Sequence, residues 1–416
     1  MHKTPEIENT APVFEVLRNT APPPDAAWTF ERLLGPVPLE TFHDTYWAKH
    51  PLLVRAAPDQ AFESLITPGK IEAMLAIPGI LREPMVSMRA KGDRVSLAPA
   101  DLGELYRLFR LGSWLQFRKM ERFLPPDAPL SQLYRDLQVQ LGHPGVSISC
   151  FFSPPGTEQI GPHYDATEIF TLQLAGRKRW RFFHHVDAED RAACDPATLG
   201  PPTRTFELGP GDFLYQPRGL VHEVMCDDAL SVSIPIIVEP VAWKDMLPLL
   251  IEGLRHRPDF MEALPSGVLL RHGAADRLAE GFSERLAVIA REIASMDVAA
   301  FADAAGTRVL SGLGAPAGAH VAALTREAGI GPGSLLRTRH GEAWQAVIRG
   351  GQAYLTVAGG ETLKGPAAIL PALQAIMARR APAKAGALHE SLSEKSSLIL
   401  ARELVRIGAL TEAGGA

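Results

Sequence analysis

The stretch GPHYDATEIFTLQLAGRKRWRFFHH, residues 161–185, combines a polar start with two apolar runs that meet at a glycine. IFTLQLAG (169–176) and RKRWRFFHH (177–185) have the length and composition of β-strands, and the glycine between them is typical of a turn. His163 and Asp165 stand just before the first run. Since side chains alternate along a strand, residues i and i+2 point to the same side. We therefore expect these two polar side chains to face the same space.

Further short strands lie on both sides of this stretch, separated by Gly and Pro turns. VSISCFFS (146–153) alternates in the manner of a strand, and PPG follows it as a turn. RTFELGPGDFLYQPRGLVHEV (204–224) reads as strand, turn, strand, loop and strand, and ALSVSIPIIV (229–238) as one more strand. Several short strands at a spacing of roughly ten residues are typical of an antiparallel barrel or jelly roll.

His222, at the end of the strand–loop–strand segment, is a candidate third partner for His163 and Asp165. The intervening chain is long enough for two hairpins to return to the same end of a barrel. Two imidazoles and one carboxylate form a facial triad, which leaves three positions of an octahedral metal open. This donor set suits Fe(II), and the open face can take a 2-oxo acid and then dioxygen. A His-x-Asp pair alone is common by chance, so the assignment depends on a co-substrate site.

The basic run GRKRW supplies a candidate for that second site. A 2-oxoglutarate co-substrate needs a fixed cation for its distal carboxylate. Alternation puts Lys178 on one face of the strand and Arg177, Arg179 and Arg181 on the other. Basic residues at a hairpin are usually a solvated edge, and we expect this of the arginines.

The stretches PPGTEQIGPHYDATEIFTLQLAGRKRWRFF and ELGPGDFLYQPRGLVHEV resemble the JmjC-type, cupin-like 2-oxoglutarate oxygenases. Among these, the sequence is most similar to the ribosomal oxygenases, which hydroxylate ribosomal proteins. FHDTYWAKHPLLVR (42–55) also resembles the N-terminal segment of that family, where a helix ending in Tyr-Trp precedes Pro-Leu-Leu. The resemblance covers residues 28–240. It implies an α+β fold, with a double-stranded β-helix (jelly roll or cupin) core and flanking helices.

The resemblance also implies roles for individual residues. His163, Asp165 and His222 occupy the positions of the family's iron ligands, which are its metal-binding and catalytic residues. Lys178 stands where family members place the Lys or Arg that pairs with the distal carboxylate of 2-oxoglutarate. Ser233, and with it Ser231, lies on the strand after the last ligand, where relatives offer a small polar group near the co-substrate. The cofactor and co-substrates implied are Fe(II), 2-oxoglutarate and dioxygen.

Two positions depart from the family pattern. Many relatives carry Asn and Tyr on the strand before the Pro-Pro-Gly turn, where this chain has Ser149 and Phe151. These positions border the co-substrate and substrate pocket, so the target side chain stays open between arginine, histidine and others. The expected function is hydroxylation of a ribosomal-protein side chain, with release of succinate and carbon dioxide. The alternatives are N-methyl demethylation of a protein, and a non-enzymatic cupin-like regulator whose winged helix contacts nucleic acid.

The chain after Pro240 changes to a helical period. In residues 276–296 one apolar stripe recurs at helical spacing: Leu278, Phe282, Leu286, Ile289 and Ile293. Such a stripe is either core packing or a subunit interface, and the family resemblance favours a homodimer. We expect four regions: a flexible lead-in (1–27), a JmjC/cupin-like catalytic domain (28–240), a helical dimerisation region (241–311), and a linker with a winged-helix-like domain (312–416).

Composition limits the remaining possibilities. The formal net charge of −5 gives no bulk electrostatic case for nucleic-acid or membrane-surface binding. Three widely spaced cysteines without a CxxC pair argue against a disulfide framework and fit a reducing compartment. Because we find no signal peptide and no apolar run of about 20 residues, we expect a cytoplasmic protein. One helix is clear before the barrel, over 131–141, and we expect Ser131 to be its N-cap.

Overall fold

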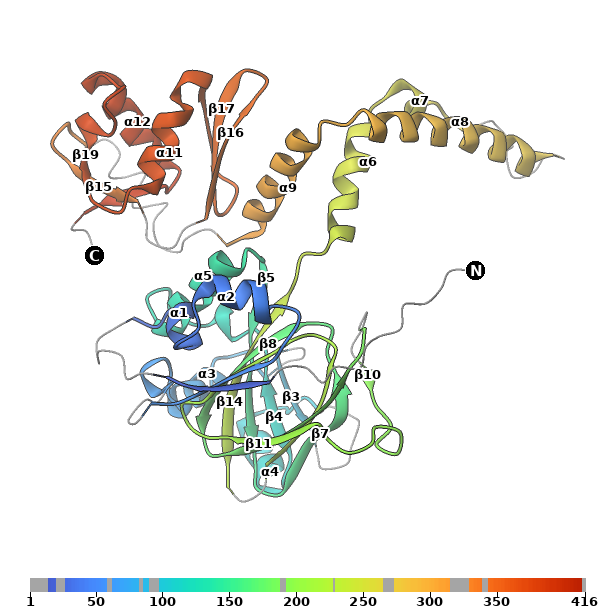
Figure 1. The fold of residues 1–416 in the computed structure, drawn as a ribbon. Coiled ribbons are helices and arrows are strands. Elements are labelled where there is room, and N and C mark those ends of the chain that lie inside the picture. The colour runs from blue at the N-terminus through green and yellow to red at the C-terminus, as the bar shows by residue number, and fades with distance from the viewer. Residues whose placement is uncertain are drawn as a thin grey trace. The chain divides into compact units, whose positions relative to one another are not determined.

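The computed structural model describes residues 14–19, 27–57, 62–81, 85–89, 97–187, 192–226, 229–264, 273–314, 329–338 and 343–413. The chain divides into two compact units, residues 1–240 and 241–416 (Figure 1). None of the described helices is both long and apolar enough to cross a membrane.

Two sheets form the framework of the first unit. The larger has the order β1-β2-β12-β8-β14-β6-β4-β3, with β5 paired to β14. Its strands are β1 (Glu15–Arg18), β2 (Leu52–Arg55), β3 (Val86–Arg89), β4 (Trp114–Phe117), β5 (Gly145–Ile148), β6 (Cys150–Ser153), β8 (Glu168–Ala175), β12 (Phe213–Gln216) and β14 (Ser231–Glu239). The smaller has the order β10-β7-β13-β9-β11. Its strands are β7 (Thr157–Tyr164), β9 (Lys178–His185), β10 (Ala192–Ala193), β11 (Arg204–Leu208) and β13 (Leu220–Cys226).

From β7 onward the chain passes back and forth between the two sheets: β7 is in the smaller sheet, β8 in the larger, β9, β10 and β11 in the smaller, β12 in the larger, β13 in the smaller and β14 in the larger. This is the cupin-like arrangement that the sequence predicts, with mixed helices and strands. Gly176 makes the turn between β8 and β9 with a φ of 64°. An added Cβ there would lie 2.0 Å from the Leu230 carbonyl oxygen, so this turn requires glycine.

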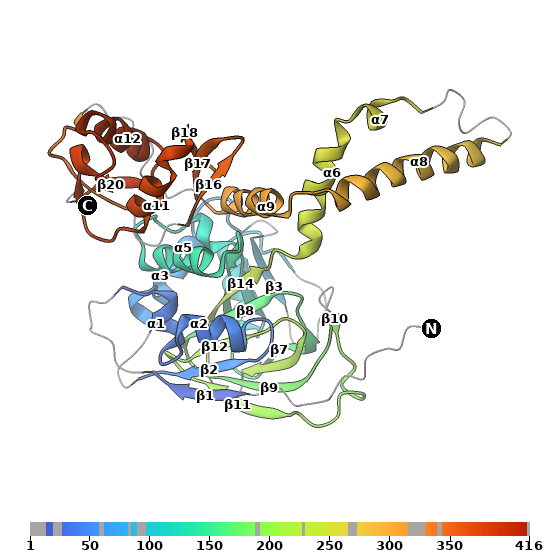
Figure 2. The ribbon, with the colours of Figure 1, turned by 45° about the horizontal axis from the view of Figure 1, so that its top comes forward.

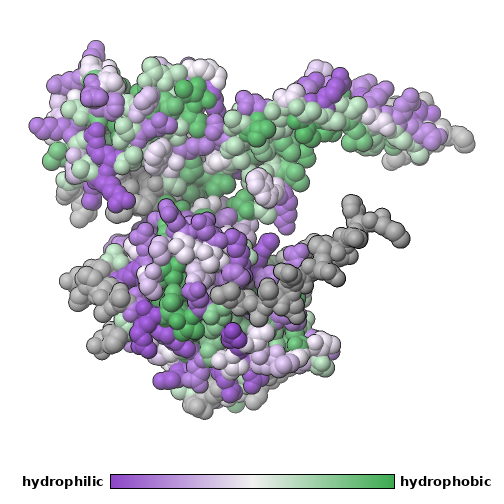
Figure 3. Space-filling view, viewed as in Figure 1, coloured by the Kyte–Doolittle hydropathy of each residue, from purple (hydrophilic) through white to green (hydrophobic). Residues whose placement is uncertain are grey.

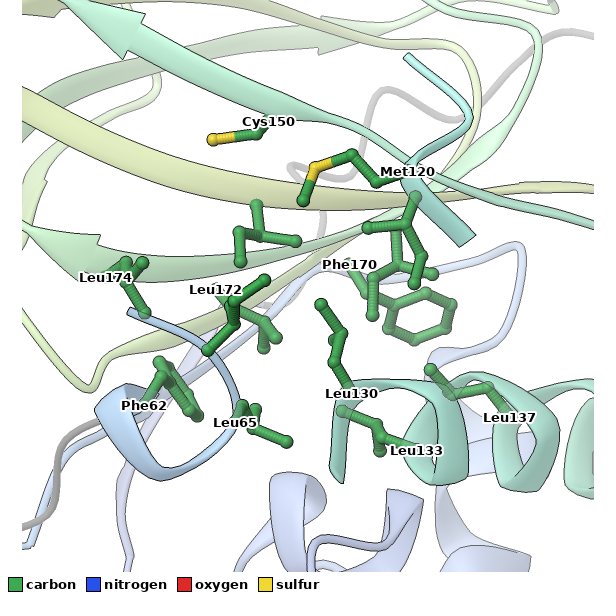
Figure 4. Close-up of a cluster of buried hydrophobic side chains, with 14 of the residues drawn as sticks. Phe62, Leu65, Met120, Leu130, Leu133, Leu137, Cys150, Phe170, Leu172 and Leu174 are labelled. Atoms are coloured by element: carbon green, nitrogen blue, oxygen red, sulfur yellow. The ribbon is translucent and has the colours of Figure 1, made fainter. Parts of the chain in front are cut away.

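The first unit also contains helices, of which the first two and the last lie close together (Figures 1 and 2). They are α1 (Phe30–Leu34), α2 (Leu39–Thr41), the π-helix Phe42–Tyr46, α3 (Pro68–Leu75), α4 (Leu102–Arg110) and α5 (Pro129–Leu141), with short 3₁₀ turns at Phe62–Ser64 and Met120–Arg122. Leu130, Leu133 and Leu137 of α5 lie against Phe170 and Leu172 of β8 in the main hydrophobic core (Figure 4).

Alternation along β8 and β14 separates this core from the space between the sheets. On β14, Val232, Ile234, Ile236 and Val238 join the core, whereas Ser233, Pro235 and Ile237 line a cavity on the opposite face. On β8, Ile169 and Thr171 likewise face the cavity. Each strand therefore holds the sheet against the helices with one face and builds the cavity with the other.

Three local expectations are corrected. Residues 15–18, expected within a flexible lead-in, form β1, which pairs in parallel with β2; residues 1–13 and 20–26 of that segment lie outside the described residues. Helix α5 begins at Pro129, a favoured first position. Ser131 is therefore inside the helix, where its hydroxyl donates to the Pro125 carbonyl.

The third correction concerns 146–153, expected as one strand. It is split into β5 and β6 at Ser149, whose backbone N–H donates to the Pro235 carbonyl at 2.9 Å. The ladder on β14 is interrupted beside this point because proline has no N–H to donate.

The second unit contains a helical part and a mixed part. The helices of the first part are α6 (Leu247–Arg255), α7 (Pro258–Met261), α8 (Ala274–Ala294) and α9 (Val298–Gly312), after a 3₁₀ turn at Trp243–Met246. The mixed part contains β15 (Leu335–Thr338), β16 (Trp344–Arg349), β17 (Gln352–Val357), β18 (Thr362–Pro366), α11 (Leu370–Ala378), β19 (Ala383–Lys384), α12 (Glu394–Arg406) and β20 (Leu410–Glu412), with 3₁₀ turns at Ala367–Ile369 and Ala385–Ala387. Its described strands form two three-stranded sheets, β19-β15-β20 and β16-β17-β18.

Candidate active site

The cavity between the two sheets brings His163, Asp165 and His222 together. His163 is near the end of β7, Asp165 directly follows that strand, and His222 lies opposite His163 on the neighbouring strand β13. One ligand atom from each of the three residues lies within 4.8 Å of the others. The His163 Nε2 atom is 3.6 Å and the His222 Nε2 atom 3.7 Å from the Asp165 Oδ2 atom.

Hydrogen bonds orient both imidazoles toward this meeting point. His163 Nδ1 lies 2.9 Å from the Gly161 carbonyl oxygen, and His222 Nδ1 lies 3.0 Å from the Leu220 carbonyl oxygen. The Gly161 carbonyl oxygen can only accept, so His163 Nδ1 carries the proton and its Nε2 lone pair is left for a metal. His222 Nδ1 lies between an acceptor, the Leu220 carbonyl oxygen, and a donor, the Gln216 side-chain nitrogen, and its Nε2 lies near the Asp165 carboxylate. The Gln216 side-chain amide also lies 2.9 Å from His222 Nδ1, and the Trp180 ring stacks on the His222 ring with centroids 5.7 Å apart. The donor set and its orientation fit a divalent transition metal.

A backbone contact fixes the spacing between the two loops that carry ligands. The Gly219 N–H, in the turn before β13, donates to the Asp165 carbonyl oxygen at 2.8 Å. Gly219 has a φ of 78°, and an added Cβ would lie 2.1 Å from the Val186 carbonyl oxygen. Only glycine fits this position, which explains the glycine in the stretch QPRGLVH.

Lys178 lies in the same cavity, on β9, with 2% of its surface exposed. Its Nζ donates to the Ser233 hydroxyl at 2.8 Å and lies 5.3 Å from the centre of the Phe151 ring. No carboxylate among the described residues forms an ion pair with it. Burial lowers the pKa of the Lys178 ammonium to about 7. A buried ammonium without a counter-ion is costly, so this end of the cavity is suited to an anionic ligand.

The other basic residues of the run face away from the cavity. Arg177 pairs with Glu207 at 3.5 Å, and Arg181 with Glu223 at 3.1 Å. Arg179, half-buried, is likewise absent from the residues that line the cavity. The separation of Lys178 from the arginines by strand alternation is therefore confirmed.

The two serines predicted to lie near the co-substrate, Ser231 and Ser233, differ in their position relative to the cavity. Ser233 lines the cavity and binds Lys178, whereas Ser231 is fully buried and does not line it. The Ser231 hydroxyl accepts a hydrogen bond from the Gln173 side chain at 2.8 Å. Of the two departures from the family pattern, Phe151 lines the cavity beside Lys178 and Ser149 does not.

A buried polar network beside the site was not found from the sequence. The Tyr215 hydroxyl donates to the Glu168 carboxylate at 2.5 Å and accepts from the Ala48 N–H at 2.8 Å. Burial raises the pKa of both the Glu168 carboxyl and the Tyr215 hydroxyl. Glu168 also accepts from the Arg218 backbone N–H, in the turn that contacts Asp165. The network thus joins the N-terminal segment to both ligand-bearing loops. Its only signal in the sequence is a polar residue within each of two apolar stretches, Glu168 in TEIF and Tyr215 in FLYQ.

Replacing Tyr215 by phenylalanine is expected to destabilise the fold by about 1–3 kcal/mol, because the Ala48 N–H and the Glu168 carboxyl each lose a buried partner. Tyr106→Phe is the matched control, since its hydroxyl donates to Glu72 at an exposed position; its effect should stay within about 0.5 kcal/mol. Urea unfolding of both variants measures the difference. Equal effects would show that the buried network adds nothing to stability.

Comparison with known proteins agrees with this geometry. A sequence model of the JmjC domain family matches residues 130–245, which include all three candidate ligands and Lys178. This part of the chain is similar to the JmjC domain. This match confirms the resemblance to the JmjC-type proteins, and relatives named ribosomal oxygenase confirm the resemblance to that group.

Individual relatives support the assignment of the JmjC domain. Ribosomal oxygenase 2 of Rattus norvegicus is 30% identical over 243 residues, which are 54% of this chain and 50% of that protein. The bifunctional lysine-specific demethylase and histidyl-hydroxylase NO66 of Drosophila persimilis is 30% identical over 263 residues, 60% of this chain and 38% of that protein. This chain therefore aligns with half or less of each of these relatives.

Solved structures of YcfD from Escherichia coli share the fold over nearly the whole chain. One superposes with a TM-score of 0.52 at 19% identity and covers 90% of this chain and 98% of the other. Another, described as a ribosomal oxygenase in complex with cobalt and 2-oxoglutarate, has a TM-score of 0.50 at 18% identity and covers 91% and 99%. At such identities the likeness concerns the fold alone.

Proposed function

We propose that this chain is an Fe(II)- and 2-oxoglutarate-dependent protein hydroxylase that acts on a ribosomal protein. One observation carries the proposal: a His-Asp-His cluster of metal-ligand geometry shares a cavity with a buried lysine that is suited to an anion. The relatives named ribosomal oxygenase and the YcfD complex with cobalt and 2-oxoglutarate support it.

Each residue has a defined task in the proposal. His163, Asp165 and His222 would hold the metal, and Lys178, oriented by Ser233, would hold the distal carboxylate of 2-oxoglutarate. Ser231 lies outside the cavity, where its hydroxyl accepts a hydrogen bond from Gln173. Bound Fe(II) supplies the oxidative chemistry with dioxygen. Thr171, Ile169 and Ile237 restrict water in a cavity of about 290 Å³. The products are a hydroxylated side chain, succinate and carbon dioxide.

Intact-mass comparison of ribosomal proteins from wild-type and deletion cells tests this function. We expect one ribosomal protein to be heavier by the mass of one oxygen atom, about 16 Da, in wild-type cells only. Restoring the wild-type gene should restore the mass, and restoring a His163→Ala variant should not. Identical masses in both strains would argue against a ribosomal-protein substrate.

Demethylation is a second candidate, because the Drosophila persimilis relative is named both a lysine-specific demethylase and a histidyl-hydroxylase. Hydroxylation of an N-methyl group gives a product that loses formaldehyde. Formaldehyde release from methylated ribosomal peptides, with loss of one methyl group by mass spectrometry, would favour this reaction. Retention of an added oxygen without formaldehyde would favour hydroxylation.

Binding of 2-oxoglutarate is expected to weaken as pH rises above about 7. The dianion needs a protonated Lys178, and burial lowers the pKa of this ammonium to about 7 in the free protein. Below that pH the lysine is already charged; above it, each pH unit should weaken binding by up to about tenfold, with uptake of one proton. Calorimetric titration between pH 6 and 8.5 measures both. Lys178→Arg should remove the dependence, and a flat profile in the wild type would contradict this role of Lys178.

We further propose that residues 241–311 are a homodimerisation region and 312–416 a linker with a winged-helix-like domain. The α8 stripe is exposed in the single chain: Phe282, Leu286 and Ile293 are exposed by 63%, 60% and 48%. Apolar surface also gathers along this helical region in Figure 3. An exposed stripe is typical of an interface. The three free cysteines favour a cytoplasmic location.

The alternative function is that of a non-enzymatic regulator whose winged helix contacts nucleic acid. Such a protein would bind duplex DNA and would not turn over 2-oxoglutarate.

Replacing both Phe282 and Leu286 by aspartate is expected to halve the solution mass, because two charges would be buried in the apolar interface. Helicity and unfolding temperature should be retained. Light scattering measures the mass, and Glu284→Gln on the exposed side of α8 is the control. An unchanged dimer would place the interface elsewhere, and a monomeric wild type would exclude it.

A further inference from the structure

Gln216, the last residue of β12, is a polar side chain beside the candidate metal ligands that has no task in the proposed mechanism. The preceding residue, Tyr215, joins the main core, whereas Gln216 lines the cavity. Only 1% of the surface of Gln216 is exposed. Its side-chain nitrogen lies 2.9 Å from His222 Nδ1, so this residue contacts a candidate ligand directly.

Two contacts of His222 Nδ1 make opposite demands on this atom. The Leu220 carbonyl oxygen, 3.0 Å away, can only accept a hydrogen bond, and the Gln216 NH2 group, 2.9 Å away, can only donate one. If Nδ1 carries a lone pair, it accepts from Gln216 but faces the lone pairs of the carbonyl oxygen. If Nδ1 carries the proton, it donates to the carbonyl oxygen but meets the NH2 group donor to donor. This orientation of the amide therefore leaves one contact unfavourable with either tautomer of His222.

The other end of the Gln216 amide is unsatisfied as well. Its Oε1 atom is buried and has no hydrogen-bond partner among the described residues. A buried acceptor without a partner costs about 1–3 kcal/mol. The amide is planar, and its oxygen and NH2 group are nearly equal in size, so a half-turn about the Cγ–Cδ bond exchanges them with little movement of other atoms. After the half-turn, Oε1 and the Leu220 carbonyl oxygen both accept from a protonated His222 Nδ1.

A bound metal requires this second arrangement. The His222 Nε2 atom lies 3.7 Å from Asp165 Oδ2, and a neutral imidazole binds a metal through Nε2 only when its proton is on Nδ1. We propose that Gln216 is a positioning residue for the metal site, whose amide turns when His222 binds the metal so that Oε1 accepts from Nδ1–H. In the metal-free protein the NH2 group donates to Nδ1. This inference rests on the proposed hydroxylase function and adds a residue to its metal site.

Two variants separate the acceptor from the volume of the side chain. Gln216→Met keeps nearly the same length but lacks a strong hydrogen-bonding group, so Co(II) binding should weaken about 10–100-fold, the usual cost of losing a partner of a metal-bound imidazole. An ionised glutamate accepts and cannot donate, so Gln216→Glu should bind Co(II) at least as tightly as the wild type. Calorimetry measures both affinities, and the visible absorption of Co(II) reports whether His222 is still a ligand.

Substitutions of Gln116 are the matched controls for volume and charge. Gln116 lines the same cavity from β4, where it pairs with Phe151 and not with a strand that carries a candidate ligand. Gln116→Met should leave Co(II) affinity unchanged, and Gln116→Glu measures the effect of an added negative charge alone. We expect the ratio of Co(II) affinities between the Glu and Met variants to be at least about tenfold larger for Gln216 than for Gln116.

Nuclear magnetic resonance observes the turn itself in the wild-type protein. With ¹⁵N-labelled histidine and glutamine, the metal-free protein should show a coupling between Gln216 Nε2 and His222 Nδ1 across their hydrogen bond. Zn(II) should abolish this coupling and give a protonated Nδ1. If a variant does not fold, these spectra decide.

Three outcomes would overturn the inference: spectra of this pair that do not change with Zn(II), wild-type Co(II) affinity in Gln216→Met, or equal weakening in Gln216→Met and Gln216→Glu. The expected pattern of Co(II) affinities without any turnover of 2-oxoglutarate would uphold the inference and count against the proposed hydroxylase function. The two failures are therefore distinguishable.

Discussion

His163→Ala is expected to lower 2-oxoglutarate turnover at least about 1,000-fold and to weaken Co(II) binding by more than about 100-fold. Loss of groups that only orient a ligand already costs about 10–100-fold in metal affinity, and this change removes a ligand itself. The remaining His222 and Asp165 cannot hold three positions of an octahedron, so the metal is held loosely.

His184→Ala is the matched control, because His184 is exposed on β9 and does not line the cavity. Calorimetry measures Co(II) affinity, and succinate formation measures turnover. The visible absorption of bound Co(II) reports its coordination and gives a reading independent of turnover. Wild-type turnover in His163→Ala with Fe(II) present would remove His163 from the metal site.

Lys178→Ala is expected to weaken 2-oxoglutarate binding about 30-fold or more while Co(II) binding stays near that of the wild type. Truncating one partner of a buried charge pair costs about 2–5 kcal/mol, and the co-substrate carboxylate would be left without its cation. The ammonium contacts Ser233 and Phe151 and no candidate metal ligand. Metal affinity and co-substrate affinity should therefore separate in this variant.

Arg177→Ala is the control for this effect, since it removes the neighbouring positive charge, which pairs with Glu207 on the outer face. Lys178→Arg should retain part of the affinity because it keeps the charge. If Lys178→Ala and Arg177→Ala bound 2-oxoglutarate equally well, the anchor would have to be another residue.

The sequence was sufficient to predict the cavity-facing residues of the strands. A period of two is unambiguous on β8 and β14, because one face is buried in the main core and the other faces the cavity. On β9 it separates Lys178, which faces the cavity, from the arginines of the outer face. His163, Asp165, His222 and Lys178 consequently fall where alternation and resemblance place them.

Features that depend on distant parts of the chain could not be predicted in this way. Only Ser233 lines the cavity: the ladder between β14 and β8 is irregular between Val232 and Ser233, and the Ser231 hydroxyl accepts a hydrogen bond from Gln173 of β8. Trp114 and Gln116 lie on β4, far along the chain from the recognisable motif, and only the folded structure shows that they line the same cavity. The prediction that Ser131 is the N-cap was wrong, because the helix begins at Pro129, about half a turn earlier.

The most direct test of the account is turnover of 2-oxoglutarate under ¹⁸O₂ by the Fe(II)-loaded protein with ribosomal proteins present. We predict one ¹⁸O atom in succinate and one in a ribosomal-protein peptide, in equal amounts, and neither product from His163→Ala. Succinate without label, or no succinate with Fe(II) bound, would contradict the assignment of this cavity as a 2-oxoglutarate oxygenase site.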